Sequence, residues 1–239
     1  MTEERKSENA LRKPRVDVVI PTYKPGKKFS RLLKMLEKRD PKGEWLSYVL
    51  LADFDLKRAD EVKSHLEQER KYREGTQYET AQVDARDREA LTALMREHRI
   101  DFVMDAASPF VSNFIFDAAF EAGADYASMG TWSVPKDHPE FGKGFEGAYL
   151  EPMTKYNFDR HEAWKEKGQM ACICLGIDPG VVNVFAKYAA EYLFDELLEV
   201  HVKDGGNLTP PESEKDEIIF GFNVWTVLDE VMNPNAEWS

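Results

Sequence analysis

The sequence has few of the residues that would suggest a metal site, and no stretch that would cross a membrane. It contains two cysteines and five histidines in 239 residues, and the histidines do not have the spacing of metal ligands. No apolar run reaches the ~18–20 residues of a membrane span. Residues 1–15 carry charges throughout and lack the apolar core of a secretory signal, so we expect a solvated tail. These absences predict a cytoplasmic protein without a bound metal.

Basic residues are also fewer than acidic residues. The chain has 32 basic and 44 acidic residues, which give a net charge of −12 and a pI of about 5.0. A negative field repels the phosphates of nucleic acids and anionic lipids, so we expect neither a nucleic-acid partner nor a membrane. The chain is long enough to bury a full core, as one large domain or two small ones.

A third absence concerns the phosphates of a nucleotide. An apolar strand is expected at residues 48–53, and its last residue, Asp53, stands where dinucleotide-binding folds hold a ribose. About twenty residues upstream such folds place a turn with the pattern G-x-G-x-x-G. Residues 21–27 read PTYKPGK instead, with two prolines that lack N–H donors and one glycine. We therefore expect the chain, as written, to bind dinucleotide weakly or not at all and to turn over little substrate.

Strands and helices alternate through the first half of the chain. Apolar runs predict strands at residues 16–20, 48–53, 78–83 and 101–107. Apolar residues at helical spacing predict helices at residues 27–38, 56–66, 86–98 and 111–122, the last ended by Gly123. This order predicts an α/β fold with a Rossmann-like parallel sheet and helices on both faces.

The pattern changes after residue 130. Residues 131–147 are rich in glycine, proline and aromatic residues, which predicts a long loop between domains. A strand at 170–177, a helix from Val181 and strands at 200–203 and 218–227 are expected beyond it. We thus predict a tail (1–15), a Rossmann-like nucleotide-binding domain with an atypical first βα unit (16–130), and part of a second, mixed α/β substrate or dimerisation domain (131–239).

Several side chains at the expected strand ends are candidates for ligand contacts. Asp53 could accept bonds from a ribose diol, or Asp53 or Asp55 could cap the following helix. Asp84 could contact an adenine edge or act as a cap. The small residues of Ala106-Ala107-Ser108-Pro109-Phe110 would let a flat nicotinamide ring lie against the strand end, or would serve tight strand–helix packing.

A second candidate group opens the helix at Val181. Asp178-Pro179-Gly180 combines an acid at an N-cap position, a proline at the first helical position and a glycine that allows close approach. Such a helix start suits a substrate carboxylate, and it equally suits a structural helix. Ser108 and Asn113 are open to the same two interpretations, ligand or cap.

An ordered series of segments resembles the saccharopine dehydrogenase-like family of NAD(P)-dependent oxidoreductases. The likeness runs from about Arg39 to the end of the chain. Its main segments are 50–56 (LLADFDL), 105–110 (DAASPF), 130–135 (GTWSVP), 161–164 (HEAW), 176–186 (GIDPGVVNVFA), 203–206 (KDGG) and 220–226 (FGFNVWT).

The resemblance implies hydride transfer between NADP or NAD and a secondary amine that links two amino-acid-like halves. It places a ribose at Asp53 and the nicotinamide beside Ala107–Phe110, and it puts Asn113, Asp178, Gly180 and Asn183 in the substrate cleft. No general acid or base is assigned. The resemblance implies a small amino-acid-like substrate as the partner. It also makes a homodimer one assembly to test.

Residues 16–26 (VDVVIPTYKPG) resemble instead the opening of family 2 glycosyltransferases. We therefore expect a composite chain, with a glycosyltransferase-like beginning on an interrupted dehydrogenase-like body. Glycosyltransfer needs an Asp-x-Asp motif for a divalent metal, and the candidate at Asp105-Ala106-Ala107 lacks the second acid. The alternatives to the oxidoreductase are thus a glycosyltransferase fragment and a non-catalytic Rossmann-like protein.

Overall fold

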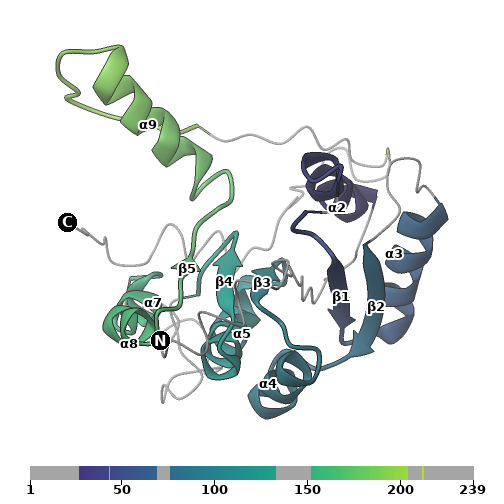
Figure 1. Ribbon diagram of the computed structural model, residues 1–239. Helices are drawn as coiled ribbons and strands as arrows, with labels where there is room; N and C mark the ends of the chain where they lie inside the picture. The colour runs from purple at the N-terminus through teal and green to yellow at the C-terminus, as the bar shows by residue number, and fades with distance from the viewer. Residues whose placement is uncertain (1–26, 43, 69–75, 133–151, 204–211, 213–239) are drawn as a thin grey trace.

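The computed structural model describes residues 27–42, 44–68, 76–132, 152–203 and 212 (Figure 1). The strands expected at 16–20 and 218–227, and most of the loop expected at 131–147, lie outside these residues. The solvated tail expected at 1–15 lies outside them as well.

Strands and helices alternate in the described residues as the sequence predicts. Their order is α2 (Lys27–Arg39), β1 (Tyr48–Asp53), α3 (Leu56–Gln68), β2 (Gln77–Gln82), α4 (Arg88–Glu97), β3 (Phe102–Asp105), α5 (Pro109–Ala122), β4 (Asp125–Ser128), α7 (Lys155–Phe158), α8 (His161–Glu166), β5 (Ala171–Cys172) and α9 (Val181–Tyr192).

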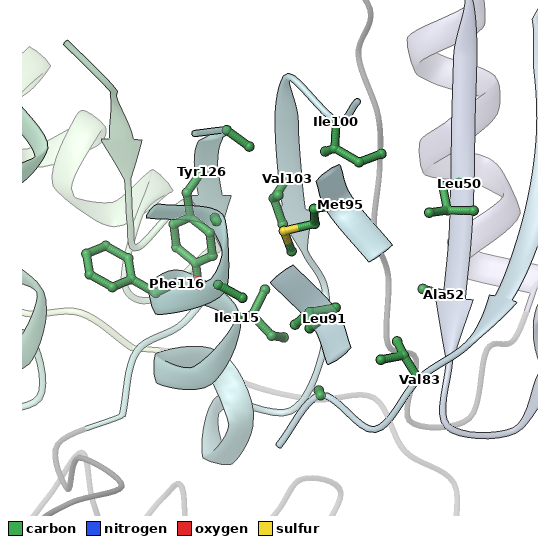
Figure 2. Close-up of a cluster of buried hydrophobic side chains, with 14 of the residues drawn as sticks. Leu50, Ala52, Val83, Leu91, Met95, Ile100, Val103, Ile115, Phe116 and Tyr126 are labelled. Atoms are coloured by element: carbon green, nitrogen blue, oxygen red, sulfur yellow. The ribbon is translucent and has the colours of Figure 1, made fainter. Parts of the chain in front are cut away.

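All the strand pairs are parallel. β1 pairs with β2 from Tyr48–Gln77 to Asp53–Gln82. β3 pairs with β4, and β4 pairs with β5, to give a three-stranded sheet of order β3-β4-β5. β1 and β2 form a separate two-stranded sheet, and Leu50 of β1 and Val103 of β3 belong to one buried cluster that joins the two sheets (Figure 2). The predicted α/β class with a parallel, Rossmann-like arrangement is confirmed.

Helices cover both faces of β1, and the strand is buried on both sides. Its residues 48, 50 and 52 join a core that includes Val83, Met95, Val103 and Ile115, so α4 and α5 lie on that face (Figure 2). Residues 49 and 51 join a second core with Leu33, Ala59 and Val62, which places α2 and α3 on the other face. A run that is apolar at every position is typical of a parallel strand between two helical layers.

Short elements after residue 150 extend the first core. Tyr156 and Trp164, from α7 and α8, are buried in the same cluster as β1 and β3. The ring of Trp164 lies 4.7 Å from that of Phe116 on α5. The three-stranded sheet continues through β5, beyond the residues assigned to the first domain, and the division into domains stays a prediction.

Two expected elements differ from the structure. The strand expected at 170–177 is limited to Ala171–Cys172, because Cys174 takes a φ of +61° and the chain then turns at Gly176. Residues 200–203 are not a strand, and Val200 and Val202 are exposed. An alternating apolar pattern predicts a strand only where a neighbouring strand is available to pair with it.

Among the described residues, no helix combines the length and the apolar character that crossing a membrane would require.

Candidate functional site

The carboxyl ends of the strands form the edge at which the sequence places its ligand contacts. Asp53 is opposite Gln82, and Asp105 is opposite Ser128. Ligands of open α/β sheets bind outside this edge. Asp53 is the last residue of β1, and the Ala106–Phe110 segment follows the last residue of β3, so each lies at the carboxyl end of a parallel strand.

Asp53 is buried, with 2% of its surface exposed, and it shapes the turn from β1 into α3. Its Oδ1 accepts a hydrogen bond from the amide of Asp55 at 2.8 Å. Asp55 in turn precedes the first residue of α3, accepts a bond from the amide of Lys57 at 3.1 Å and forms an ion pair with Arg58. Asp55 therefore occupies the helix start that was one alternative for Asp53. A ribose contact for Asp53 stays a prediction.

Asp84 does not cap α4. The cap is Asp87, whose Oδ1 accepts a hydrogen bond from the amide of Ala90 at 3.0 Å. Asp84 instead forms a two-pronged ion pair with the Arg86 guanidinium, with N···O distances of 2.7 and 3.0 Å. The hydrogen bond from Arg86 holds the pKa of Asp84 below its ordinary value. The capping interpretation of Asp84 was therefore wrong, because α4 begins only at Arg88 and Asp87 is its N-cap.

A hollow of about 480 Å³ opens beside this ion pair, at the end of β2. Its walls are Asp84 and residues 86–89. The hollow is polar and lies next to the edge at which an adenosine would be expected. An adenine contact by Asp84 is a prediction that this position suits.

The segment that follows β3 is held in place by Asp105. This carboxylate is buried and accepts hydrogen bonds from the Tyr126 hydroxyl at 2.7 Å and the Ala107 amide at 2.9 Å. Burial raises the pKa of Asp105, and its hydrogen bonds, including those from Ser112 and Tyr126, oppose that rise. Burial likewise raises the pKa of Tyr126 well above its ordinary value. Asp105 is thus a buried anchor within the fold.

The anchoring role of Asp105 was not predicted from the sequence, where Asp105 was considered as the first acid of an incomplete metal motif. The available signal was an acid at the end of a buried strand followed by two alanines, a pattern in which the carboxylate bonds back to the chain. In the part of the chain that the structure describes, no cluster of three or more histidine, cysteine or acidic residues could hold a metal ion.

Small side chains follow the anchor. Ala106, Ala107 and Ser108 are half-buried, and α5 begins at Pro109. Ser108 stands at the N-cap position without a side-chain hydrogen bond to the helix, so capping does not use its hydroxyl. The ring of Phe110 packs edge-on against Trp132 at 4.3 Å, which joins the start of α5 to the chain after β4.

Asn113 also links the start of α5 to the chain after β4. Its Nδ2 donates to the carbonyl oxygen of Trp132 at 3.1 Å, so it is not a helix cap. Its Oδ1 is buried and accepts no hydrogen bond from the described residues. A buried acceptor without a donor is costly and is often completed by water or a ligand.

The Asp178–Gly180 segment differs from its predicted role. The N-cap of α9 is Gly180, and the helix begins at Val181, so Asp178 does not cap it and Pro179 is not its first residue. Asn183 completes the cap, because its Oδ1 accepts a bond from the Gly180 amide at 3.1 Å. The local pattern was compatible with either start, and the tight turn at Gly180 decides it.

That turn is nevertheless close to the edge formed by β3 and β4. The Leu175 amide donates to the Ser128 carbonyl at 2.9 Å, and a Cβ on Gly176 would lie 2.9 Å from the Met129 carbonyl oxygen. A Cβ on Gly130 would in turn lie 3.3 Å from the Pro109 ring. The chain segments after β3, β4 and β5 therefore adjoin one another, and Asp178, Gly180 and Asn183 lie just beyond them.

With this geometry in view, comparisons with known proteins give the family. The sequence profile of the saccharopine dehydrogenase NADP binding domain matches residues 30–172. The chain belongs to this family. The match supports the predicted cofactor class, NADP or NAD. It gives no support to a glycosyltransferase-like beginning.

Two curated relatives are similar over about half of the chain or more. Carboxynorspermidine synthase of Vibrio cholerae is 37% identical over 126 residues, which cover 53% of this chain and 28% of that protein. Carboxyaminopropylagmatine dehydrogenase of Synechocystis sp. is 27% identical over 156 residues, which cover 65% of this chain and 34% of that protein. The chain thus spans about a third of the length of these relatives.

Among solved structures, apo saccharopine dehydrogenase (L-Glu forming) from Saccharomyces cerevisiae has a TM-score of 0.47 at 15% identity. The alignment covers 74% of this chain and 31% of that one.

Proposed function

We propose that the chain forms the nucleotide-binding part of an NAD(P)-dependent oxidoreductase that acts on a secondary amine. The observation that carries the proposal is the match of residues 30–172 to an NADP-binding domain, combined with parallel strand ends that bear an acid and a run of small residues.

The described residues suit the different parts of a dinucleotide. The Asp53 carboxylate is at the strand end that holds a ribose in such folds, and Asp84 lines a hollow large enough for a flat ring system. Ala106, Ala107, Ser108 and Phe110 would lie beside the nicotinamide, where small side chains leave room for a planar ring. When bound, the cofactor supplies or accepts the hydride.

The chain's own contribution is to hold this edge in a fixed shape. Asp105 accepts bonds from Ala107 and Tyr126, which fixes the direction of the Ala106–Ser108 segment. Phe110 and Trp132 form an aromatic wall beside it, which would exclude water from one side of the ring. Positioning of this kind lowers the entropic cost of reaching the reactive geometry.

The names of two relatives support a proposal for the substrate class. Both a carboxynorspermidine synthase and a carboxyaminopropylagmatine dehydrogenase handle an amine with a carboxyl-bearing substituent. We extend this class to the chain: an imine formed between a primary amine and an amino-acid aldehyde is reduced at carbon by hydride and protonated at nitrogen. Asn113, Asp178, Gly180 and Asn183 would line the substrate side. We also propose that two copies of the chain assemble as a homodimer.

Cofactor binding is the direct test, and it is designed to detect weak binding. The chain is titrated with NADPH and with NADH, followed by nicotinamide fluorescence, alongside the variants Ala107→Leu and Ala163→Leu. Ala107 follows β3 and Ala163 lies exposed on α8, so the two variants add the same bulk at different places. We expect Ala107→Leu to weaken binding at least tenfold and Ala163→Leu to leave it unchanged.

Binding that both variants leave unchanged, or no saturable binding at millimolar cofactor, would overturn the proposal in favour of a non-catalytic Rossmann-like protein. The substrate class is tested separately, by the loss of NADPH absorbance when an amino-acid aldehyde is mixed with agmatine or a diamine. A rate that does not depend on the amine would contradict imine reduction while leaving the cofactor proposal intact.

A further inference from the structure

The turn that follows β1 places a carboxylate and an aromatic ring next to each other in the chain. Asp53 ends β1 with 2% of its surface exposed, and the next residue, Phe54, is 64% exposed. The Oδ1 atom of Asp53 accepts a hydrogen bond from the Asp55 amide at 2.8 Å, which fixes the direction of the carboxylate. The turn therefore offers a held hydrogen-bond acceptor beside an exposed apolar ring.

The same turn is tied to the end of β2. The Val83 amide donates to the carbonyl oxygen of Asp53 at 3.0 Å, and Nε2 of Gln82 donates to the carbonyl oxygen of Phe54 at 3.0 Å. The polar hollow of about 480 Å³ opens just after this strand end. The two hydrogen bonds thus keep the turn after β1 next to the chain that lines the hollow.

The basic side chains at these two strand ends are balanced by acidic ones. Residues 53–58 and 84–89 together contain five acidic and four basic residues. The fourth basic residue besides the arginines, Lys57, is exposed in the first turn of α3. The three arginines form ion pairs, Arg58 with Asp55 at 3.4 Å, Arg86 with Asp84 at 2.7 Å and Arg88 with Glu121 at 3.3 Å. These two turns therefore hold no excess of positive charge for an added phosphate.

We infer that Asp53 and Phe54 select a nicotinamide dinucleotide with free ribose hydroxyls, NAD or NADH, over the 2′-phosphorylated NADP or NADPH. The inference rests on the proposed function and deepens it, because the family match leaves both cofactors open. A ribose hydroxyl donates a hydrogen bond to a carboxylate. A 2′-phosphate instead brings about two negative charges, and a buried carboxylate repels them with little screening by solvent.

Phe54 stands directly after the acid, where an arginine would be able to hold a 2′-phosphate. Phosphates are recognised by arginine and lysine side chains, which donate charged hydrogen bonds. A phenyl ring has no such donor, and the negative face of its π system disfavours an anion. An exposed ring does stack well on a nucleotide base. Phe54 thus contributes affinity for the adenine that both cofactors share, while Asp53 sets the choice between them.

Two matched pairs of variants separate these roles in the full chain. Asp53→Asn removes the charge and keeps an oxygen that can accept the Asp55 hydrogen bond, and Asp159→Asn makes the same change at the end of α7. Phe54→Ala removes the exposed ring at the turn, and Phe158→Ala removes a ring that is 41% exposed on α7. Figure 1 shows α7 on the far side of β3 and β4 from α3, so the controls lie away from the turn.

Titration of each protein with NADH and with NADPH, followed by nicotinamide fluorescence, measures the two dissociation constants. We expect the unaltered chain and both α7 variants to bind NADH about tenfold more tightly than NADPH. Asp53→Asn should bring the two affinities within about threefold of each other, mainly by improving NADPH binding. Phe54→Ala should weaken the binding of both cofactors about tenfold and leave their ratio unchanged.

The outcomes separate this inference from the proposed function. NADPH binding as tight as NADH binding in the unaltered chain would overturn the inference and leave the proposed function intact. The absence of saturable binding for both cofactors would overturn the two together. An unchanged ratio in a folded Asp53→Asn variant would also overturn the inference, and a ratio that changes in Lys57→Ala instead would assign the choice to that side chain.

The role of Phe54 is decided separately, and it does not require Asp53→Asn to fold. Equal affinities in Phe54→Ala and Phe158→Ala would remove Phe54 from the adenine site. Circular dichroism of each variant verifies that the fold is retained.

Discussion

Helices α5 and α9 are both rich in apolar residues, but α5 is buried in the core and α9 is exposed. α5 has 14 residues and α9 has 12, and both follow a strand and are rich in apolar residues. α5 buries seven residues, among them Phe114, Ile115 and Phe116, whereas α9 buries none. The difference shows that apolar spacing identifies a face that needs a partner, while the partner itself is chosen by the arrangement of the sheet.

The largest expected effect is the removal of a core ring. Phe116 is 1% exposed, and its ring packs against Tyr126 at 5.3 Å and Trp164 at 4.7 Å. Phe116→Ala should lower the free energy of unfolding by about 3–5 kcal/mol, because it removes apolar contacts and leaves a cavity. Chemical denaturation followed by far-ultraviolet circular dichroism measures the change.

Phe185→Ala on α9 is the matched comparison. It should cost less than half as much, because Phe185 is 67% exposed and its removal leaves no cavity in the core. Equal losses for Phe116→Ala and Phe185→Ala would show that α9 belongs to the same cooperative core as α5.

An intermediate effect is expected at the turn that directs α9. Gly180 has a φ of +141°, and a Cβ there would lie 2.2 Å from the Gly176 carbonyl oxygen. Gly180→Ala should destabilise the turn locally by about 1–3 kcal/mol, since the backbone must move to relieve strain. Hydrogen exchange of the Val181 amide, which is bonded to Gly176, should then become faster.

Gly123→Ala, at the end of α5, sharpens this comparison. Gly123 has a φ of +87°, but a Cβ there would meet no atom within 4 Å. Only the left-handed backbone penalty, about 1 kcal/mol, applies. A larger effect at Gly123 than at Gly180 would mean that crowding around the α9 turn is relieved at little cost.

The smallest effect concerns the pH dependence of stability. The pKa of Asp105 is raised by burial from its ordinary value of 3.8, so the folded state holds its proton to higher pH than the unfolded state does. Stability contributed by this group is therefore greatest below pH 3.8 and falls as the pH rises through the folded pKa. Relative to the unaltered protein, Asp105→Asn should gain stability as the pH rises, measured by denaturation at several pH values.

Asp84→Asn serves as a control of opposite sign. Arg86 lowers the pKa of Asp84 below 3.8, so its contribution is present above that pH and is lost as the pH falls. The variant should lose stability relative to the unaltered protein as the pH rises. The same slope for both variants would contradict the assignment of Asp105 to a buried position and Asp84 to an ion pair.

Much of the fold could be predicted from local sequence because the signals there agree. The apolar run at residues 48–53 predicted β1 with its bounds, and Gly123 ends α5 in the left-handed conformation that glycine favours. The sequence also predicted a strand before the Ala106–Phe110 segment, although β3 ends at Asp105 rather than at residue 107.

Other features required contacts between distant residues. Asp105 bonds to Tyr126, which is 21 positions later, and Asn113 bonds to the backbone of Trp132. The capping pattern at Asp178 was misread, because Gly180 and Asn183 provide the cap. Asp84 forms an ion pair with Arg86, and Asp87 is the N-cap of α4.

The sequence by itself determined the order of the strands and helices, the apolar faces and the places where the chain must turn. These properties depend on neighbouring side chains and on backbone preferences, which act over a few residues. Only the tertiary structure decided that α5 is buried while α9 stands exposed, and that Asp105 anchors the site. Burial and hydrogen bonding of this kind depend on which segments meet in space, and that information is distributed over the whole chain.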